Sequence, residues 1–371
     1  MRYFLIFFVC CCTGTVLSQP DNSSLMFNQE VDTTHEKEVF FKIQNLNYLK
    51  NNEYYGYMAD GYTQFGIQLN PQIGYQLSRN LSIEAGVFLS KDFGNRDFNN
   101  VDPTFSLRYH KNDFKMIFGN LDGSLNHRLI EPLYNFERVI TNRLEGGMQF
   151  MLNKRYFDFD LWADWQNMIY RQSNGAEKVW GGLSGHLLKL RSGQMELKLP
   201  LQVTVLHSGG QIDTSHASMT TNWNYNAGMA LTYTPSTGPF QQFILDARYV
   251  GNLHYLFTPA QSQKDGYGVL ANAGFTAYNT DVMFSYWYGN NYISDYGGYL
   301  YSSRSSAVYY SYIYRVQRSL LILRLTKRIR LADRVGLTLR AEPYYDFFQN
   351  LFEYSFGFYI NLDERIWLKK K

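Results

Sequence analysis

The chain has 371 residues with 35 basic and 32 acidic side chains, and its formal net charge is +3. This near balance excludes the strongly basic surface of a nucleic-acid-binding protein, so no nucleic-acid partner is expected. Aromatic residues make up 17% of the chain, yet the mean hydropathy is −0.34. The apolar residues must therefore be dispersed among polar ones, which excludes a bundle of membrane-spanning helices.

Residues 1–18 have the pattern of a secretory signal peptide. Arg2 precedes a short apolar run from Tyr3 to Cys12, and small residues follow. The run is shorter than the roughly 20 residues that a membrane-spanning helix needs. All three cysteines lie in this segment, so the mature chain has no disulfide to stabilise it. We expect an exported protein that starts with a polar N-terminal lead over residues 19–37.

Apolar and polar residues alternate with a period of two along most of the chain. In the segment 156–166, Phe157, Phe159 and Leu161 would share one face of a strand. The opposite face would carry Asp158, Asp160 and Asp164. The pattern predicts strands with one face toward lipid and the other toward a polar interior.

The pattern predicts an all-β fold, a transmembrane antiparallel barrel of about sixteen strands over residues 38–363, with a basic tail at 364–371. The segment 306–330 is long enough to hide a turn, so about fourteen or about eighteen strands remain open. The predicted strands are 39–49, 62–77, 81–90, 103–110, 114–121, 143–152, 156–167, 178–190, 195–207, 223–234, 242–253, 267–278, 281–288, 306–330, 335–346 and 351–362.

The last predicted strand resembles the C-terminal β-signal of Gram-negative outer-membrane barrels. The matching positions are Ser355, Gly357, Ile360 and Leu362, although Asp363 to Lys371 follow where many members end. The resemblance implies recognition by the outer-membrane insertion machinery and a location among outer-membrane lipid and lipopolysaccharide. The Tyr-, Phe- and Asn-rich composition is similar to that of barrels of the Bacteroidota.

Short and long connections alternate, which predicts short turns on the periplasmic rim and long loops outside. The loop 122–142 is the longest internal connection, and its place after the fifth strand resembles the constriction loop of porins. The alternative is a solvated outer loop. The candidates for lining a constriction are Arg128, Glu131, Glu137, Arg138 and Arg143 in or beside the loop, and Asp158, Asp160, Asp164, Arg324 and Arg340 on the wall.

The function expected from this pattern is a porin-like channel for small hydrophilic solutes, with no cofactor and no metal. The alternatives are an accessory barrel of a surface or capsule-related assembly, and an outer-membrane hydrolase. Ser184 and His186 share a strand face but do not complete a nucleophile motif. Three histidines, at 207, 216 and 254, could gather at the outer rim. Because neither set forms a recognisable catalytic group, the expectation is that the chain is not an enzyme.

Overall fold

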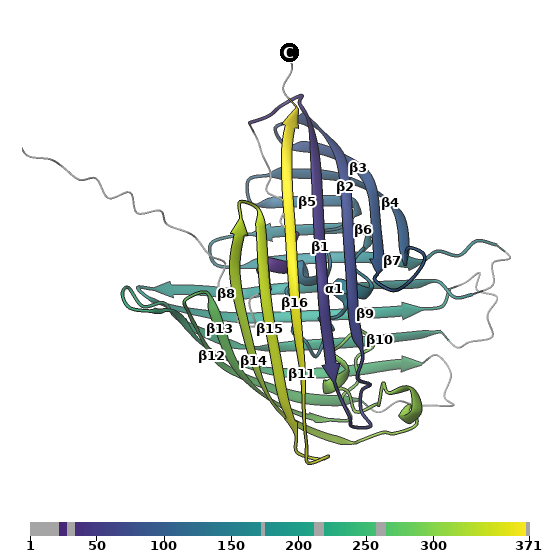
Figure 1. Ribbon diagram of the computed structural model, residues 1–371, viewed down its shortest axis with the longest axis vertical. Coiled ribbons are helices and arrows are strands. Elements are labelled where there is room, and N and C mark those ends of the chain that lie inside the picture. Colours follow the sequence, from purple (N-terminus) through teal and green to yellow (C-terminus); the bar gives the residue numbers. More distant parts are fainter. Residues whose placement is uncertain (1–21, 28–33, 172–174, 211–218, 257–264, 369–371) are drawn as a thin grey trace, which may run out of the picture.

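The computed structural model describes residues 22–27, 34–171, 175–210, 219–256 and 265–368. Sixteen antiparallel strands close into one barrel, which confirms the predicted fold class and strand number (Figure 1). The strands are β1 Val39–Glu53, β2 Thr63–Ser78, β3 Leu81–Asp92, β4 Asn100–Lys111, β5 Phe114–Asn120, β6 Gly146–Asn153, β7 Asp158–Asn167, β8 Lys178–Ser192, β9 Met195–Ser208, β10 Thr220–Tyr233, β11 Phe240–Leu256, β12 Gly266–Ala277, β13 Thr280–Asn290, β14 Gln317–Ala332, β15 Val335–Asp346 and β16 Leu351–Leu368.

Within the described ranges, helical structure is confined to single turns. They are η1 Ser23–Leu25, η2 Ser124–His127, α1 Arg138–Thr141, η3 Tyr299–Tyr301 and η4 Val308–Tyr310. None of the helices in the described part of the chain is long and apolar enough to cross a membrane.

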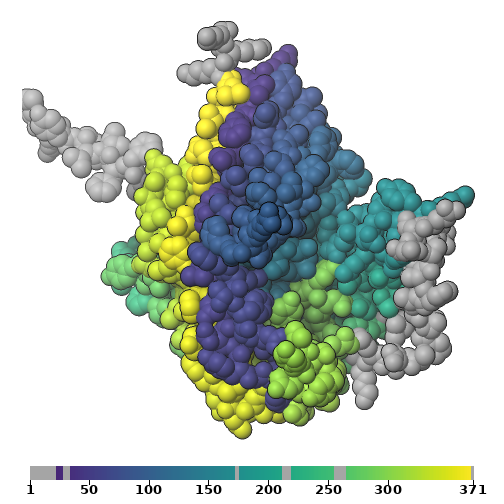
Figure 2. Space-filling view, turned by 45° about the vertical axis from the view of Figure 1, so that its right-hand side comes forward, coloured from purple at the N-terminus to yellow at the C-terminus, as the bar shows by residue number. Residues whose placement is uncertain are grey.

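The barrel closes where β16 pairs with β1, and the two strands run side by side along the surface (Figure 2). The pairing continues to Val39 opposite Leu368. The predicted tail at 364–371 is therefore wrong for residues 364–368, which extend β16, because β1 offers backbone partners along this whole length. The predicted signal peptide lies outside the described residues.

The predicted strand 306–330 is shorter than expected. Residues 306–316 belong to the loop that precedes β14, and the backbone of Ser306 donates to the carbonyl oxygen of Met58 at 3.0 Å. The backbone of Val308 donates to Asp60 Oδ2 at 2.7 Å. Contacts with the first long loop thus satisfy backbone groups that a longer strand would have paired with its neighbours.

The two faces of the wall follow the predicted alternation. Asp158, Asp160 and Asp164 point inward and are at most 5% exposed, whereas Leu161 and Trp165 point outward at 51% and 46%. The outward face is expected to meet lipid, since its side chains are largely aliphatic and aromatic.

Two-residue turns fit the twist of the sheet. Tyr278 and Asn279, between β12 and β13, both have positive φ values, 50° and 56°. Positive φ at both central residues is characteristic of the type I′ turn, whose twist matches that of the strands it joins. The turns 79–80, 112–113, 193–194 and 333–334 lie on the same rim, called here the short-turn rim.

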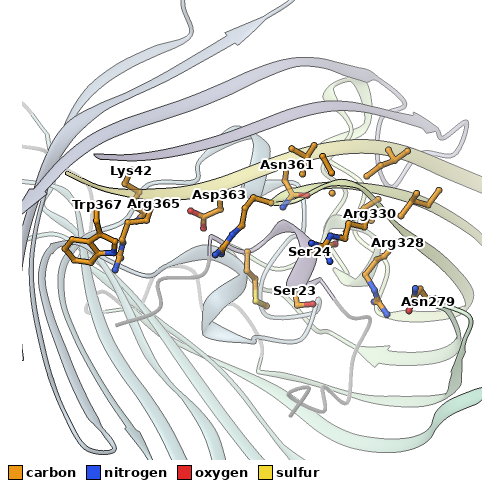
Figure 3. A pocket seen from close by; sticks show the side chains of 18 of the residues that line it. Ser23, Ser24, Lys42, Asn279, Arg328, Arg330, Asn361, Asp363, Arg365 and Trp367 are labelled. Carbon is orange, nitrogen blue, oxygen red and sulfur yellow. Dashed lines mark hydrogen bonds between the residues drawn. The ribbon is translucent and has the colours of Figure 1, made fainter. Parts of the chain in front are cut away.

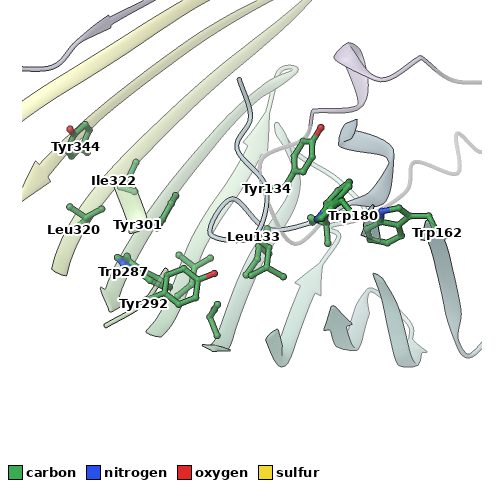
Figure 4. Close-up of a cluster of buried hydrophobic side chains, with 14 residues drawn as sticks. Leu133, Tyr134, Trp162, Trp180, Trp287, Tyr292, Tyr301, Leu320, Ile322 and Tyr344 are labelled. Atoms are coloured by element: carbon green, nitrogen blue, oxygen red, sulfur yellow. The ribbon is translucent and has the colours of Figure 1, made fainter. Parts of the chain in front are cut away.

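The middle of the interior is filled rather than open. The part of the N-terminal lead at Asn22–Phe27 lies inside the barrel, where Leu25 is 2% exposed and its carbonyl oxygen accepts from Arg143 Nη2 at 2.8 Å. A cluster of buried apolar side chains, among them Trp162, Trp180 and Trp287, also occupies the lumen (Figure 4). Strands and loops therefore contribute together to two apolar clusters inside the barrel.

Candidate functional site

The loop between β5 and β6, residues 121–145 and called here the inner loop, crosses the lumen. Its carbonyl groups at Val139 and Ile140 accept from Gln68 Nε2 on β2, at 3.1 and 2.7 Å. On the opposite wall, Gln202 on β9 accepts from the backbone of Ile130 at 3.0 Å and donates to the carbonyl oxygen of Arg128 at 2.6 Å. The loop thus bridges two sides of the barrel.

A buried imidazole fixes the start of the inner loop. His127 Nδ1 lies 2.7 Å from Asp160 Oδ2, and Nε2 lies 2.7 Å from Glu145 Oε2. The ring stacks on Trp162 with 3.7 Å between ring centroids. Burial opposes a charge on His127, but the carboxylates of Glu145 and Asp160 outweigh it and raise the pKa of His127 to about 10. The imidazolium therefore pairs with two carboxylates at once, one at each ring nitrogen.

The acidic wall meets the cationic part of the inner loop. Arg128 Nη2 lies 2.7 Å from Asp158 Oδ1, and this carboxylate also contacts His186 at 2.9 Å and Lys189 at 3.0 Å. The structure thus brings together two of the predicted charged residues, Arg128 and Asp158. Asp164 instead accepts from the backbone of Gly146 at 2.8 Å.

The basic wall meets the acidic part of the same loop. Arg340 Nη2 lies 2.8 Å from Glu131 Oε1 and 2.6 Å from Glu342 Oε1. Arg324 Nε lies 2.9 Å from Glu342, and Arg324 also pairs with Glu131. Charges of opposite sign on separate walls are therefore matched by opposite charges on one loop.

The remaining predicted loop residues have separate partners. Glu137 Oε1 lies 2.7 Å from Lys50 Nζ on β1, and Arg138 lies over the ring of Tyr296 at 4.0 Å. Arg143 lies over the ring of Phe27, 3.5 Å from its centroid. Arg138 is thus not among the residues that meet the acidic wall.

A second loop, residues 291–316 and called here the cap loop, packs onto the inner loop. Tyr292 is buried and donates its hydroxyl to the carbonyl oxygen of Pro132 at 2.9 Å. Tyr301 is 2% exposed and contacts Glu131 Oε2 at 2.7 Å. Cavities beside the inner loop are small, about 50 and 60 Å³. In this conformation the two loops occupy the middle of the barrel.

Several of these contacts were missed by the sequence reasoning, namely those of His127, Glu145, Glu342 and Tyr301. Glu342 lies on the inward face of a recognised alternation and was open to prediction. The partners of His127 were not, because no spacing connects a loop residue with Asp160 on a later strand.

Ser184 and His186, which share a strand face, do not pair with each other. Ser184 donates to the carbonyl oxygen of His127, and His186 contacts Asp158. His254 lies 3.0 Å from Asn222 Oδ1. Residue 216, a histidine, lies outside the described residues. The suggested histidine cluster therefore has no support among the described residues.

A different polar group lies on the outward face of the wall, near the long-loop ends of its strands. His207 on β9 faces Thr221 on β10 in the strand register, and its Nδ1 lies 2.9 Å from Thr221 Oγ1. Trp165 Nε1 donates to Glu177 Oε1 at 3.0 Å, and Glu177 accepts through its carbonyl oxygen from the backbone of Gly209 at 2.9 Å. An imidazole and a hydroxyl thus lie on the paired strands β9 and β10, and a carboxylate lies just before β8.

The β-signal positions lie on the strand that closes the barrel. Ser355 is buried and faces inward, and Ile360 and Leu362 lie opposite Asn47 and Asn45 of β1. The structure places these residues at the seam, and their recognition by insertion machinery stays a prediction.

The model of the lipid A 3′-O-deacylase-type family matches residues 31–371. The chain belongs to this family. The expectation that the chain is not an enzyme is therefore wrong, because the family that the match identifies is named for a deacylase. The sequence offered no familiar catalytic motif that would have indicated this.

Solved outer-membrane proteins share the fold of this family member. OmpT of Vibrio cholerae, in its trimer form, has a TM-score of 0.50 at 10% identity, with 89% of this chain and 100% of that chain covered. OprD of Pseudomonas aeruginosa has a TM-score of 0.50 at 10% identity, with 91% and 99% covered. No curated protein matches. This deacylase-type chain is an outer-membrane β-barrel with lipid around its wall.

Proposed function

We propose that the protein hydrolyses an acyl ester of lipid A from the outward face of its barrel. The observation that carries the proposal is the His207–Thr221 pair, a group able to act as a base on a face expected to meet lipid. The family match supports the substrate class. The filled lumen supports an external site, because the inner and cap loops leave only small cavities beside them.

His207 would act first as a general base and then as a general acid. In the tautomer protonated at Nδ1, His207 donates to Thr221 Oγ1 and leaves Nε2 as an acceptor. A water molecule attacks the ester carbonyl carbon while its proton passes to Nε2. The imidazolium then returns a proton to the departing sugar oxygen, which yields a free fatty acid and a sugar hydroxyl. Glu177 lies just before β8, and its carboxylate accepts from Trp165 Nε1.

The test is release of fatty acid from lipid A in mixed detergent micelles, followed by mass spectrometry of both products. Wild-type protein should remove an ester-linked acyl chain, and His207→Gln should lower the rate about 100-fold or more. His254→Gln is the matched control, because this histidine contacts Asn222 rather than Thr221, and it should retain activity. An inactive wild type contradicts the proposal, and an active His207→Gln variant contradicts the assigned site.

A second candidate is a channel for small hydrophilic solutes that conducts when the inner loop leaves the lumen. It is favoured by the barrel size, since sixteen strands can surround a water-filled pore, and by the charges of Arg128 and Glu131 near its centre. In planar bilayers, Arg128→Ala with Arg138→Ala should shift the reversal potential toward cation preference. The paired control, Arg304→Ala with Asp295→Ala in the cap loop, should leave it unchanged. Absence of single-channel conductance in the wild type contradicts this candidate.

A further inference from the structure

A cavity of about 700 Å³ lies inside the barrel at the short-turn rim (Figure 3). Its wall is formed by the ends of β1, β14, β15 and β16, and Ser24 of η1 closes it toward the inner loop. Ser24 is held there by a hydrogen bond of 2.8 Å to Thr338. The volume of this cavity lies within the range of small-molecule sites.

The charged side chains that line this cavity are mostly cations. Asp363 is the one carboxylate among the described residues that line it. The acidic partners of several cations lie outside the lining, such as Asp281 for Arg328 and Asp333 for Arg330. The lining cations are Lys42, Arg328, Arg330, Arg334 and Arg365. The cavity therefore presents positive charge inward although neighbouring acids balance the region as a whole.

Two buried polar atoms of the lining have no hydrogen-bond partner within the described part of the chain. Lys42 is 1% exposed, and its Nζ makes no hydrogen bond, since Glu84 Oε2 lies 3.6 Å away. Asn361 Oδ1 is likewise buried without a partner. Lys42 thus has a carboxylate as ion-pair partner but no hydrogen-bond acceptor, and an oxyanion in the cavity would supply one. An unsatisfied carbonyl oxygen calls for a hydrogen-bond donor.

We propose that this cavity binds a small periplasmic anion, a phosphate or carboxylate that also carries hydroxyl groups. The anionic group would pair with Lys42, with Arg365 nearby on β16. A hydroxyl group would donate to Asn361 Oδ1, and the ring face of Trp367 offers an apolar wall for the carbon chain. The short-turn rim is expected to face the periplasm, so the ligand enters from that side. The site does not depend on the proposed lipid hydrolysis.

The test is isothermal titration of the detergent-solubilised protein with glucose 6-phosphate, gluconate and glucose at low salt. Glucose 6-phosphate or gluconate should bind saturably, one molecule per barrel, and raising the salt should weaken binding. Lys42→Met should weaken it at least tenfold. Lys91→Met is the matched control and should bind as the wild type does, because Lys91 lies near the other end of the barrel and bonds to carbonyl groups of the 93–99 loop.

Folding of each variant is checked by heat-modifiable gel mobility. If Lys42→Met does not fold, Asn361→Ala provides a second test of the site. This variant should lose affinity for glucose 6-phosphate and keep affinity for inorganic phosphate. Binding of glucose 6-phosphate alone identifies a phosphate site, and binding of gluconate alone identifies a carboxylate site. The proposal is overturned if neither anion binds, if glucose binds equally well, or if both Lys42→Met and Asn361→Ala bind like the wild type.

Discussion

At the scale of single residues, polar side chains inside this barrel act mainly as partners of other protein groups. His127 illustrates this, since both of its ring nitrogens lie 2.7 Å from carboxylates and its side chain is fully buried. Replacing one member of such a buried group leaves the others charged and unpaired, which is more destabilising than losing a surface ion pair.

The charge on His127 should make stability depend on pH. Its pKa is raised from 6.5 to about 10 in the folded protein, so its stabilising effect is complete below about pH 6.5. The effect should decline as the pH rises from about 6.5 to about 10, because the unfolded chain loses this proton first. Urea unfolding in detergent across this range should show the decline in the wild type. His127→Gln should be less stable by about 3–5 kcal/mol at pH 6 and lack this component of the pH dependence. If the free energy of unfolding depended on pH equally in both proteins, a charged His127 would be refuted.

Outward residues should respond to charge according to their depth in the membrane. Leu199 lies near the middle of β9 and Met195 at its short-turn end. Leu199→Arg should destabilise the barrel by about 2–4 kcal/mol, and Met195→Arg should destabilise it by about 0–1 kcal/mol. Equilibrium unfolding in lipid vesicles measures both. Equal effects would mean that β9 does not present this face to hydrocarbon. A charge placed on the inward face at Gln202 would not serve as a control, because the side chain of Gln202 makes two hydrogen bonds to the inner loop.

At the scale of elements, the inner loop connects separate walls of the barrel across its interior. It carries a histidine toward the acidic wall and Glu131 toward the basic wall. Since these contacts lie at separate points along the loop, each limits movement of a different part of it. The Glu131 contacts should control the segment nearest the cap loop, which contains Pro132 and contacts Tyr292.

Removing the charge of Glu131 should loosen this part of the inner loop. Glu131→Gln leaves Arg324 and Arg340 sharing Glu342 alone, so amide hydrogen exchange should increase over residues 128–136. Exchange in the β-strands should not change. Glu36→Gln is the control, since the Glu36–Arg79 pair is exposed and spans 3.5 Å. Unaltered exchange in the inner loop would show that the charged contacts do not hold it.

At the scale of the whole molecule, closure depends on the long seam between β1 and β16. Every backbone group at membrane depth needs a partner, and a closed barrel meets this need by pairing its first and last strands. The seam extends to Leu368, which is beyond the segment that resembles a β-signal. The final residues of β16 therefore belong to the closure and are not an appendage.

Shortening the seam should destabilise the barrel. Deletion of residues 364–371 removes the register partners of Val39 to Ile43, and each lost hydrogen bond should cost about 0.5–1.5 kcal/mol. When samples are heated before gel electrophoresis, the band of the folded protein should disappear at a clearly lower temperature than in the wild type. Deletion of residues 369–371 alone leaves these register partners in place and should change it little. Similar behaviour of the two truncated proteins would contradict a structural role for the end of β16.

The period-two alternation by itself predicted about sixteen strands, and it determined the inward position of Asp158, Asp160 and Asp164 and the outward position of residues such as Leu161. Alternation is a local property of a strand, and the lipid on one side makes it regular. The loop 122–142 was recognisable by its length, and the Arg128–Asp158 contact followed from placing it inside. The predicted strand at 306–330 failed at its start because apolar and aromatic residues alternate in the cap loop as they do in strands.

Only the tertiary structure decided how the lumen is filled. His127, Glu145 and Asp160 come from a loop, the residue before a strand and a strand, and no sequence spacing relates them. The same holds for Glu131, which lies between β5 and β6, with Arg324 on β14 and Arg340 on β15. Closure brings these distant residues together, and buried charges are stable there only when each has a partner of opposite sign. The outward pairing of His207 with Thr221 likewise depends on the register between two strands, which the alternation alone does not determine.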